Sequence, residues 1–286
     1  MAVAQILSIQ SAVSYGFAGN SVASFTLRRA GIDVWPVYTV NFSNHTGYGA
    51  WRGQVMTPEQ VAEVVQGIDE RGALAEIDAV LSGYQGAPQM GRTILEAVEL
   101  TRTRSPQAIY CCDPVMGDVD RGFYAAPGIP EFLRDHVVPQ ATIMSPNMFE
   151  LEFLTSRRTS TIAEVLAAAS DLRSRGPQTV LVTSVVGLDA DDSVMRMIAQ
   201  DATGSWQVET PMIDRKFTGS GDLTTAVFLA GLLASGGDLA YSLARTASVV
   251  YSVLLRTHEL GRRELALVQA QDEIVVPTQR FVATEL

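Results

Sequence analysis

The chain has 286 residues, 47% of them hydrophobic, which is enough to build a large buried core. A formal net charge of −10, with no basic stripe between aromatic residues, argues against a nucleic-acid partner. No apolar stretch is long enough to cross a membrane, and no basic region precedes an apolar N-terminal segment. The only cysteines, Cys111 and Cys112, are adjacent, which suits neither a disulfide nor a zinc site, so we expect a cytoplasmic protein.

Short runs rich in Val, Ile and Leu alternate with helical patterns, which is typical of a parallel sheet covered on both faces. We find no linker or repeat, so residues 1–286 are expected to form one α/β domain. Capping boxes at 57–60 and 161–164 predict two helix starts. The expected strands are 4–10, 33–40, 79–83, 108–113, 141–145 and 179–184, followed by a hairpin of 193–200 and 205–209. The expected helices are 57–71, 89–104, 161–175, 223–234 and 239–254.

Polar residues follow several of these strands. In open parallel sheets, ligands bind at the carboxyl ends of the strands, so chemistry is expected directly after each apolar run. The first predicted strand ends at Gln10 and continues into Ser11, and residues 41–48 follow the second. Residues 113–118 and 145–150 take the same place after two later strands. We expect all four segments to converge on one edge of the sheet.

A glycine-rich turn precedes the helical run 223–233. Gly219, Ser220 and Gly221 leave backbone N–H groups free to bind an anion where the helix dipole favours one. Asp222 beside that anion hole is suited to take a proton from an attacking hydroxyl. An aspartate that only caps a turn has the same sequence, so this pattern alone leaves both interpretations open.

Three acidic residues at predicted strand ends, Asp113, Asp118 and Glu150, form a set suited to Mg²⁺ around a triphosphate, although each alone also fits a cap or a loop charge. The spacing of a dinucleotide-binding turn and a Walker A sequence are both missing. His45, between Asn44 and Thr46, suits a polar pocket for a small ring-shaped substrate rather than a metal site.

These motifs together resemble the pyridoxal kinases of the ribokinase-like superfamily, over essentially the whole chain. The blocks that carry the resemblance are Ser8-Ile9-Gln10-Ser11, Phe42-Ser43-Asn44-His45-Thr46-Gly47-Tyr48, Cys112-Asp113-Pro114-Val115-Met116-Gly117-Asp118, Pro146-Asn147 with Glu150, and Gly219-Ser220-Gly221-Asp222. The segments 265–272 and 281–284 also resemble the closing helix and strand of that family. The resemblance implies a three-layer sandwich with a central, mostly parallel sheet flanked by helices.

The implied activity is transfer of the γ-phosphoryl group of ATP to the 5′-hydroxymethyl of pyridoxal, and of pyridoxine and pyridoxamine, in vitamin B6 salvage. The resemblance makes Asp222 the general base, with Gly219, Ser220 and Gly221 as the anion hole. It assigns the vitamin pocket to Ser11, Thr46, Gly47, Trp51, Tyr84 and Asp222. It assigns ATP contacts to Asp113, Tyr124, Ser145, Asn147, Glu150, Thr183, Ser184 and Ile213, and metal contacts to Asp118 and Glu150. Mg²⁺, a monovalent cation such as K⁺, and a homodimer are implied as well.

Two other functions fit the same residues. A kinase of this fold that acts on hydroxymethylpyrimidine or another small alcohol would phosphorylate that substrate at least as efficiently as pyridoxal. A non-catalytic pyridoxal-binding protein would bind its ligand without ATP turnover, and the intact Asp222 turn argues against it.

Overall fold

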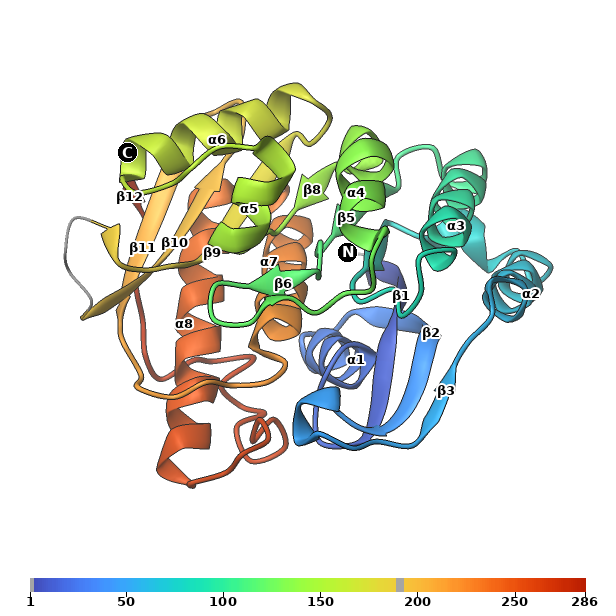
Figure 1. Cartoon of the computed structure of the whole chain (residues 1–286), viewed down its shortest axis with the longest axis horizontal. Coiled ribbons are helices and arrows are strands. Elements are labelled where there is room, and N and C mark those ends of the chain that lie inside the picture. The colour runs from blue at the N-terminus through green and yellow to red at the C-terminus, as the bar shows by residue number, and fades with distance from the viewer. Residues whose placement is uncertain (1–2, 189–192) are drawn as a thin grey trace.

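A twisted sheet forms the middle of the molecule in the computed structural model, which describes residues 3–188 and 193–286. Its parallel centre consists of β1 (Gln5–Tyr15), β2 (Asp33–Asn44), β4 (Ala79–Ser82), β5 (Ile109–Cys112), β8 (Ile143–Met144) and β9 (Thr179–Val185). Antiparallel strands extend both edges: β3 (Gly53–Val55), β10 (Val194–Gln200), β11 (Ser205–Pro211) and β12 (Thr284–Glu285). In the described chain the strand order is β12-β11-β10-β9-β8-β5-β4-β1-β2-β3 (Figure 1).

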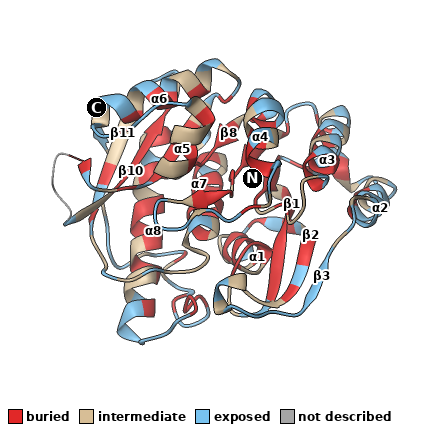
Figure 2. Cartoon of the chain, viewed as in Figure 1, coloured by how far each residue is buried: buried red, intermediate tan, exposed pale blue. Residues whose placement is uncertain are grey.

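Helices cover both faces of this sheet. One face packs against α1 (Asn20–Arg29), α7 (Ser220–Ser235) and α8 (Leu239–Glu259). The other packs against α2 (Pro58–Asp69), α3 (Met90–Arg104), α4 (Ile129–Phe132), α5 (Met148–Thr155) and α6 (Ile162–Ser174). Buried residues concentrate in the strands and on the inner sides of the helices (Figure 2). The predicted three-layer α/β sandwich is therefore confirmed.

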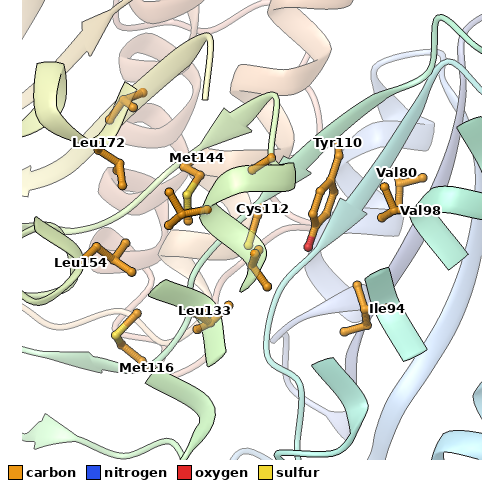
Figure 3. Close-up of a cluster of buried hydrophobic side chains, with 14 of the residues drawn as sticks. Val80, Ile94, Val98, Tyr110, Cys112, Met116, Leu133, Met144, Leu154 and Leu172 are labelled. Atoms are coloured by element: carbon orange, nitrogen blue, oxygen red, sulfur yellow. The ribbon is translucent and has the colours of Figure 1, made fainter. Parts of the chain in front are cut away.

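The two cysteines show how the sheet separates the two cores. Successive side chains of a strand point to opposite faces, so Cys111 packs with the α7 and α8 side while Cys112 packs beside Tyr110 and Met144 on the other side (Figure 3). Both thiols are free and buried, and burial raises the pKa of Cys112 to about 12. They pack in the two cores.

Strands β1 and β2 are longer than the sequence predicts. They pair with each other beyond the end of β4, as far as Tyr15 and Asn44, with a register shift between Gln10 and Ala12. Mutual pairing satisfies the backbone of both extensions, so polar side chains there do not end the strands. Ser11 and residues 41–44, which the sequence places after the strands, therefore lie within them.

The other predicted strands appear within one or two residues of their expected bounds, and the predicted helices all form, although α8 continues to Glu259. Both predicted capping boxes are present, at Thr57 and at Thr161. Elements that are not among those predicted from the sequence are α1, α4, α5 and β3, together with the hairpin of β6 (Gly117–Asp118) and β7 (Gly122–Phe123). No helix in the described residues is long and apolar enough to cross a membrane.

The predicted closing helix at 265–272 is wrong, because this segment forms turns. Leu265, Ala266 and Leu267 are buried at consecutive positions, a pattern that a surface helix with one buried face cannot produce. The final strand also differs from the expected 281–284, since β12 consists of Thr284 and Glu285.

Candidate active site

Asp222 lies in the first turn of α7, at the carboxyl edge of the sheet. The N-cap residue of this helix is Gly219, and no side chain caps the helix. The Asp222 carboxylate instead accepts a hydrogen bond of 2.8 Å from the N–H of Gly19, which is 203 residues away in the sequence. Burial raises the pKa of Asp222 to about 6, against the opposing effect of the Gly19 N–H. The aspartate is thus a tertiary contact and not an ordinary helix cap.

Gly19 also brings Ser11 to this acid. Its φ of 56° is in the left-handed region, and a Cβ built there would lie 2.2 Å from the Ser11 carbonyl oxygen and 2.4 Å from the Ser11 hydroxyl. Only glycine allows that close approach. Ser11, predicted to hold substrate, and Asp222, the predicted base, therefore lie on either side of one backbone turn.

The predicted anion hole forms at the start of α7. Gly219 has a φ of 84°, and a Cβ there would lie 2.4 Å from the Phe17 carbonyl oxygen, so this position also needs glycine. The Ser220 hydroxyl donates to the Phe217 carbonyl at 2.9 Å, which orders the turn. The N–H groups of Gly221 and Asp222 belong to a first helical turn, where no intrahelical acceptor exists. The helix dipole adds to the attraction for an anion at this point.

A chain of buried polar groups continues from this turn. The Thr225 hydroxyl lies 3.3 Å from a carboxylate oxygen of Asp113, to which it donates, and 2.8 Å from the hydroxyl of Ser145. Burial, together with the charges of Glu150 and Asp222, raises the pKa of Asp113. Sequence reasoning missed Thr225, although its spacing of three residues from Asp222 places both on one side of the helix.

Glu150 and Asn147 form a third capping box, at the start of α5. Each side chain accepts a hydrogen bond from the other residue's backbone N–H, at 2.9 Å in both cases. The second oxygen of Glu150 accepts from the Met116 N–H at 3.0 Å, and the Asn147 amide donates to the Gly117 carbonyl at 2.9 Å. Burial raises the pKa of Glu150 to about 7 despite these N–H donors. The Asn-x-x-Glu spacing is a capping signal that is visible in the sequence.

Asp118 and Tyr124 border the β6–β7 hairpin. Arg121 donates to the Asp118 carboxylate from its Nε at 2.8 Å, and its guanidinium lies 4.5 Å from the centre of the Tyr124 ring. Burial tends to raise the pKa of Asp118, but the Arg121 hydrogen bonds lower it overall. The turn of this hairpin is joined to the loop before Gly219 by an exposed ion pair of 2.5 Å between Asp120 and Lys216.

The remaining residues predicted to contact ATP lie near the ends of β9 and β11. The Thr183 N–H donates to the Pro146 carbonyl at 2.9 Å, and this residue forms a bridge with Asn147. Ser184 has a φ of 53°, a conformation that is uncommon for a residue other than glycine. Ile213 follows β11, and its carbonyl accepts from the Arg215 N–H. Thr183 therefore joins the carboxylate side of the site, whereas the side chains of Ser184 and Ile213 share no hydrogen bond with it among the described residues.

The turn that contains Thr46 and Gly47 is ordered by His45. The Nδ1 atom of His45 accepts from the Gly47 N–H at 3.0 Å and caps the short 3-10 helix Thr46–Tyr48. Burial and the nearby Arg121 charge lower the pKa of His45. A neutral imidazole can keep this acceptor role, so His45 shapes the turn.

Tyr84 and Trp51 border a small apolar cluster beside this turn. Buried Val13, Ala18, Val40 and Phe42 form the cluster, and Tyr84 packs against it. The Trp51 ring lies 6.1 Å from that of Phe42 and is 48% exposed. Because Val13 and Ala18 are close in sequence to Ser11 and Gly19, the cluster forms an apolar wall next to the polar groups. This combination suits a flat, partly polar ring.

Comparisons with known proteins agree with this geometry. Residues 56–267 match the family model described as phosphomethylpyrimidine kinase. Pyridoxal kinase PdxY of Leifsonia xyli is 49% identical over 282 residues, covering 99% of both chains. Pyridoxal kinase PdxY of Rubrobacter xylanophilus is 50% identical over 277 residues, covering 96% of this chain and 95% of the relative.

Solved structures of pyridoxal kinases have a similar fold. The pyridoxal kinase of Leishmania donovani, solved with ADP and pyridoxine, superposes with a TM-score of 0.90 at 28% identity, and the match covers 99% of each chain. The chain therefore belongs to the phosphomethylpyrimidine kinase family and, within it, to the pyridoxal kinases.

Proposed function

We propose that this enzyme transfers the γ-phosphoryl group of ATP to the 5′-hydroxymethyl of pyridoxal, pyridoxine and pyridoxamine, which supplies pyridoxal 5′-phosphate by salvage. The observation that carries the proposal is the Asp222 carboxylate, held by the Gly19 N–H at the first turn of α7 with a pKa of about 6. Such a carboxylate is ionised at neutral pH and still basic enough to act as a general base. The names of the relatives supply the substrate class.

In this mechanism, Asp222 removes the proton of the hydroxymethyl group as its oxygen attacks the γ-phosphorus. The bond from the γ-phosphorus to the bridging oxygen breaks, and ADP leaves with that oxygen. The anion hole of Gly219, Ser220 and Gly221 stabilises the charge on the transferring phosphoryl oxygens, because its turn is already formed before the reaction. The Ser220 N–H donates to the Phe217 carbonyl and holds this turn, so the Gly221 N–H, which has no intrahelical acceptor, is the donor that faces the phosphoryl group. Proton removal and charge stabilisation thus come from one helix turn.

The vitamin pocket that we propose joins the two turns described above. Ser11 binds the pyridine ring, Thr46 and Gly47 line one side, and Trp51 and Tyr84 supply the apolar walls. Support comes from the contact of Gly19 with both Ser11 and Asp222, which brings these two side chains to one turn.

For ATP we propose contacts from Asp113, Tyr124, Ser145, Asn147, Glu150, Thr183, Ser184 and Ile213. Asp113 is the carboxylate best suited to a hydrated Mg²⁺, because Asp222 and Glu150 place negative charge beside it and a cation would offset that charge. The oxygens of Glu150 already accept hydrogen bonds from backbone N–H groups, so Glu150 would contact Mg²⁺ through water. Asp118 would contact the ion from the β6–β7 hairpin. Among the described residues, no group of three acidic, His or Cys side chains is arranged to hold a metal ion. Mg²⁺ supplies charge neutralisation of the phosphates when it is bound.

Other parts of the proposal concern assembly and location. We propose a single kinase domain, since β1 and β12 belong to one sheet. We also propose a homodimer, a monovalent cation such as K⁺, and a cytoplasmic location, the last supported by two free thiols.

The test is ATP-dependent phosphorylation by purified protein with Mg²⁺, in which kcat/KM is compared for pyridoxal, pyridoxine, pyridoxamine and hydroxymethylpyrimidine. We expect the three B6 vitamers to be preferred. A preference for hydroxymethylpyrimidine would instead favour the activity after which the matched family is named. Binding of pyridoxal without turnover of any of the four would support a carrier and contradict the role of Asp222.

A further inference from the structure

Glu264 is a buried carboxylate far from the sequence motifs of the site. It is only 9% exposed and lies in the turns that follow α8. Among the described residues, no Lys, Arg or His side chain forms an ion pair with it. A buried carboxylate without a cation needs hydrogen-bond donors to offset the loss of water. Its donors therefore indicate what the residue does.

Both donors come from turns that border the proposed vitamin pocket. The Tyr48 hydroxyl donates to one oxygen of Glu264 at 2.6 Å, and the Phe17 N–H donates to the other at 3.1 Å. Tyr48 ends the turn that contains Thr46 and Gly47. Phe17 precedes by two residues the Gly19 N–H that holds Asp222. One carboxylate thus joins the vitamin-binding turn to the segment that holds the base.

The surroundings of Glu264 are shaped to bring it close. Gly16 has a φ of 83°, and a Cβ there would lie 2.0 Å from a Glu264 oxygen, so any side chain would displace the carboxylate. The guanidinium of Arg263 lies 3.6 Å from the centre of the Tyr48 ring and donates to the Gly47 carbonyl at 3.1 Å. Leu265 would lie 3.3 Å from a Cβ at Gly219, next to the anion hole. Three consecutive residues therefore contact three segments of the site.

The Tyr48 hydroxyl acts as a lasting donor in this arrangement. Its hydrogen bond to Glu264, followed by burial and the Glu264 charge, raises the pKa of Tyr48 to about 12. The phenol therefore keeps its proton throughout the neutral range.

We propose that Glu264 is a positioning residue that fastens the turn 45–48 to the turn 16–19 and so aligns the hydroxymethyl of the bound vitamin with Asp222. This inference rests on the proposed function, because it takes the turn 45–48 as part of the vitamin pocket. It predicts a specific loss of vitamin affinity when the contact is broken. The residues proposed to contact ATP include none of Glu264, Tyr48 and Phe17, so ATP binding is expected to be little affected.

The test compares Glu264→Ala, Glu264→Gln and Tyr48→Phe, with Glu259→Ala as an exposed control on the neighbouring end of α8. Glu264→Ala is expected to raise the KM for pyridoxal about tenfold, because it removes two hydrogen bonds to a charged group, while the KM for ATP stays within about twofold. Glu264→Gln should recover most of the loss, since its amide oxygen can accept from Phe17 and its amide nitrogen can donate to the Tyr48 hydroxyl. Tyr48→Phe should show an intermediate effect.

A double mutant separates positioning from general damage. Because Glu264→Ala already removes the bond to Tyr48, the variant with both changes should bind pyridoxal no more weakly than Glu264→Ala alone. An unchanged pyridoxal KM in Glu264→Ala or in Tyr48→Phe would overturn the proposal. Equal increases in both KM values, together with a lowered Tm, would also overturn it by indicating a merely structural role.

The proposed function can fail separately from this inference. A wild-type protein that does not phosphorylate pyridoxal would refute the function, whatever the variants do. Equilibrium binding of pyridoxal, followed by tryptophan fluorescence, tests the Glu264 contact without turnover. The same tenfold weakening in Glu264→Ala is expected there, and equal affinity in wild type and variant would contradict the positioning role. If Glu264→Ala does not fold, Tyr48→Phe decides the question by the same measurements.

Discussion

Replacing Asp222 with Asn tests the proposed base and has opposite expected effects on activity and stability. The amide has nearly the same shape, and its oxygen can still accept the hydrogen bond from the Gly19 N–H. It cannot take a proton from the hydroxymethyl group. General-base catalysis contributes about 10²-fold to 10⁴-fold, so we expect kcat to fall by about 100-fold or more.

The pKa of Asp222 predicts that the same change stabilises the fold. Burial raises this pKa from 3.8 to about 6, so the folded state holds the proton more tightly than the unfolded state. Stability due to this group therefore falls as the pH rises from about 4 to about 6, and the full penalty is present at pH 8. The difference corresponds to about 3 kcal/mol. Because Asp222 is partly exposed, solvent screening reduces this to about 1–2 kcal/mol, which Asp222→Asn should recover.

The assay follows ADP release with saturating ATP and pyridoxal, and denaturant unfolding at pH 8 gives the free energy of unfolding. Asp33→Asn is the control, since Asp33 is exposed at the start of β2, at the opposite end of that strand from the site. Unchanged turnover in Asp222→Asn would refute the role of the base. A loss of activity together with a large loss of stability would refute the reasoning from burial.

Three further predictions concern the same helix turn. The kcat/KM for pyridoxal should fall about tenfold per pH unit below about 6, because protonated Asp222 cannot act as a base, and a profile that is flat down to pH 5 would contradict this. Gly219→Ala should lower the free energy of unfolding by at least about 2 kcal/mol, since it adds a clash with the Phe17 carbonyl to left-handed strain. The control is Gly236→Ala, at the other end of α7, where a φ of 68° imposes the same strain but no atom lies within 4 Å of the added Cβ. Equal losses of stability in the two variants would show that the clash with the Phe17 carbonyl is unimportant. Thr225→Val removes a hydroxyl that donates a hydrogen bond to Asp113, so the free energy of unfolding should fall by about 1–3 kcal/mol and the KM for ATP should rise. A variant with wild-type stability and wild-type KM would contradict a role for this hydrogen bond.

The sequence predicted the positions of most strands and helices well, because these depend on local patterns of residues. Hydrophobic periodicity gave the strands of the parallel centre, and the boxes at Thr57 and Thr161 marked two helix starts. The motif blocks identified the family. The prediction failed at 265–272, where consecutive apolar residues are buried in turns by contacts with distant parts of the chain. The single domain and the assigned roles of the site residues stay predictions.

The arrangement of the site was decided by the tertiary structure. Asp222 is held by Gly19, and Glu264 joins Tyr48 to Phe17 across separations of 216 and 247 residues. No local pattern encodes such contacts, because they depend on which strand ends and helix turns meet after the sheet has formed. The raised pKa values of Asp113 and Asp222 arise in the same way, since burial and neighbouring charges exist only in the folded chain. The sequence by itself thus determined the elements and the residue types available for chemistry, while folding determined which of them meet.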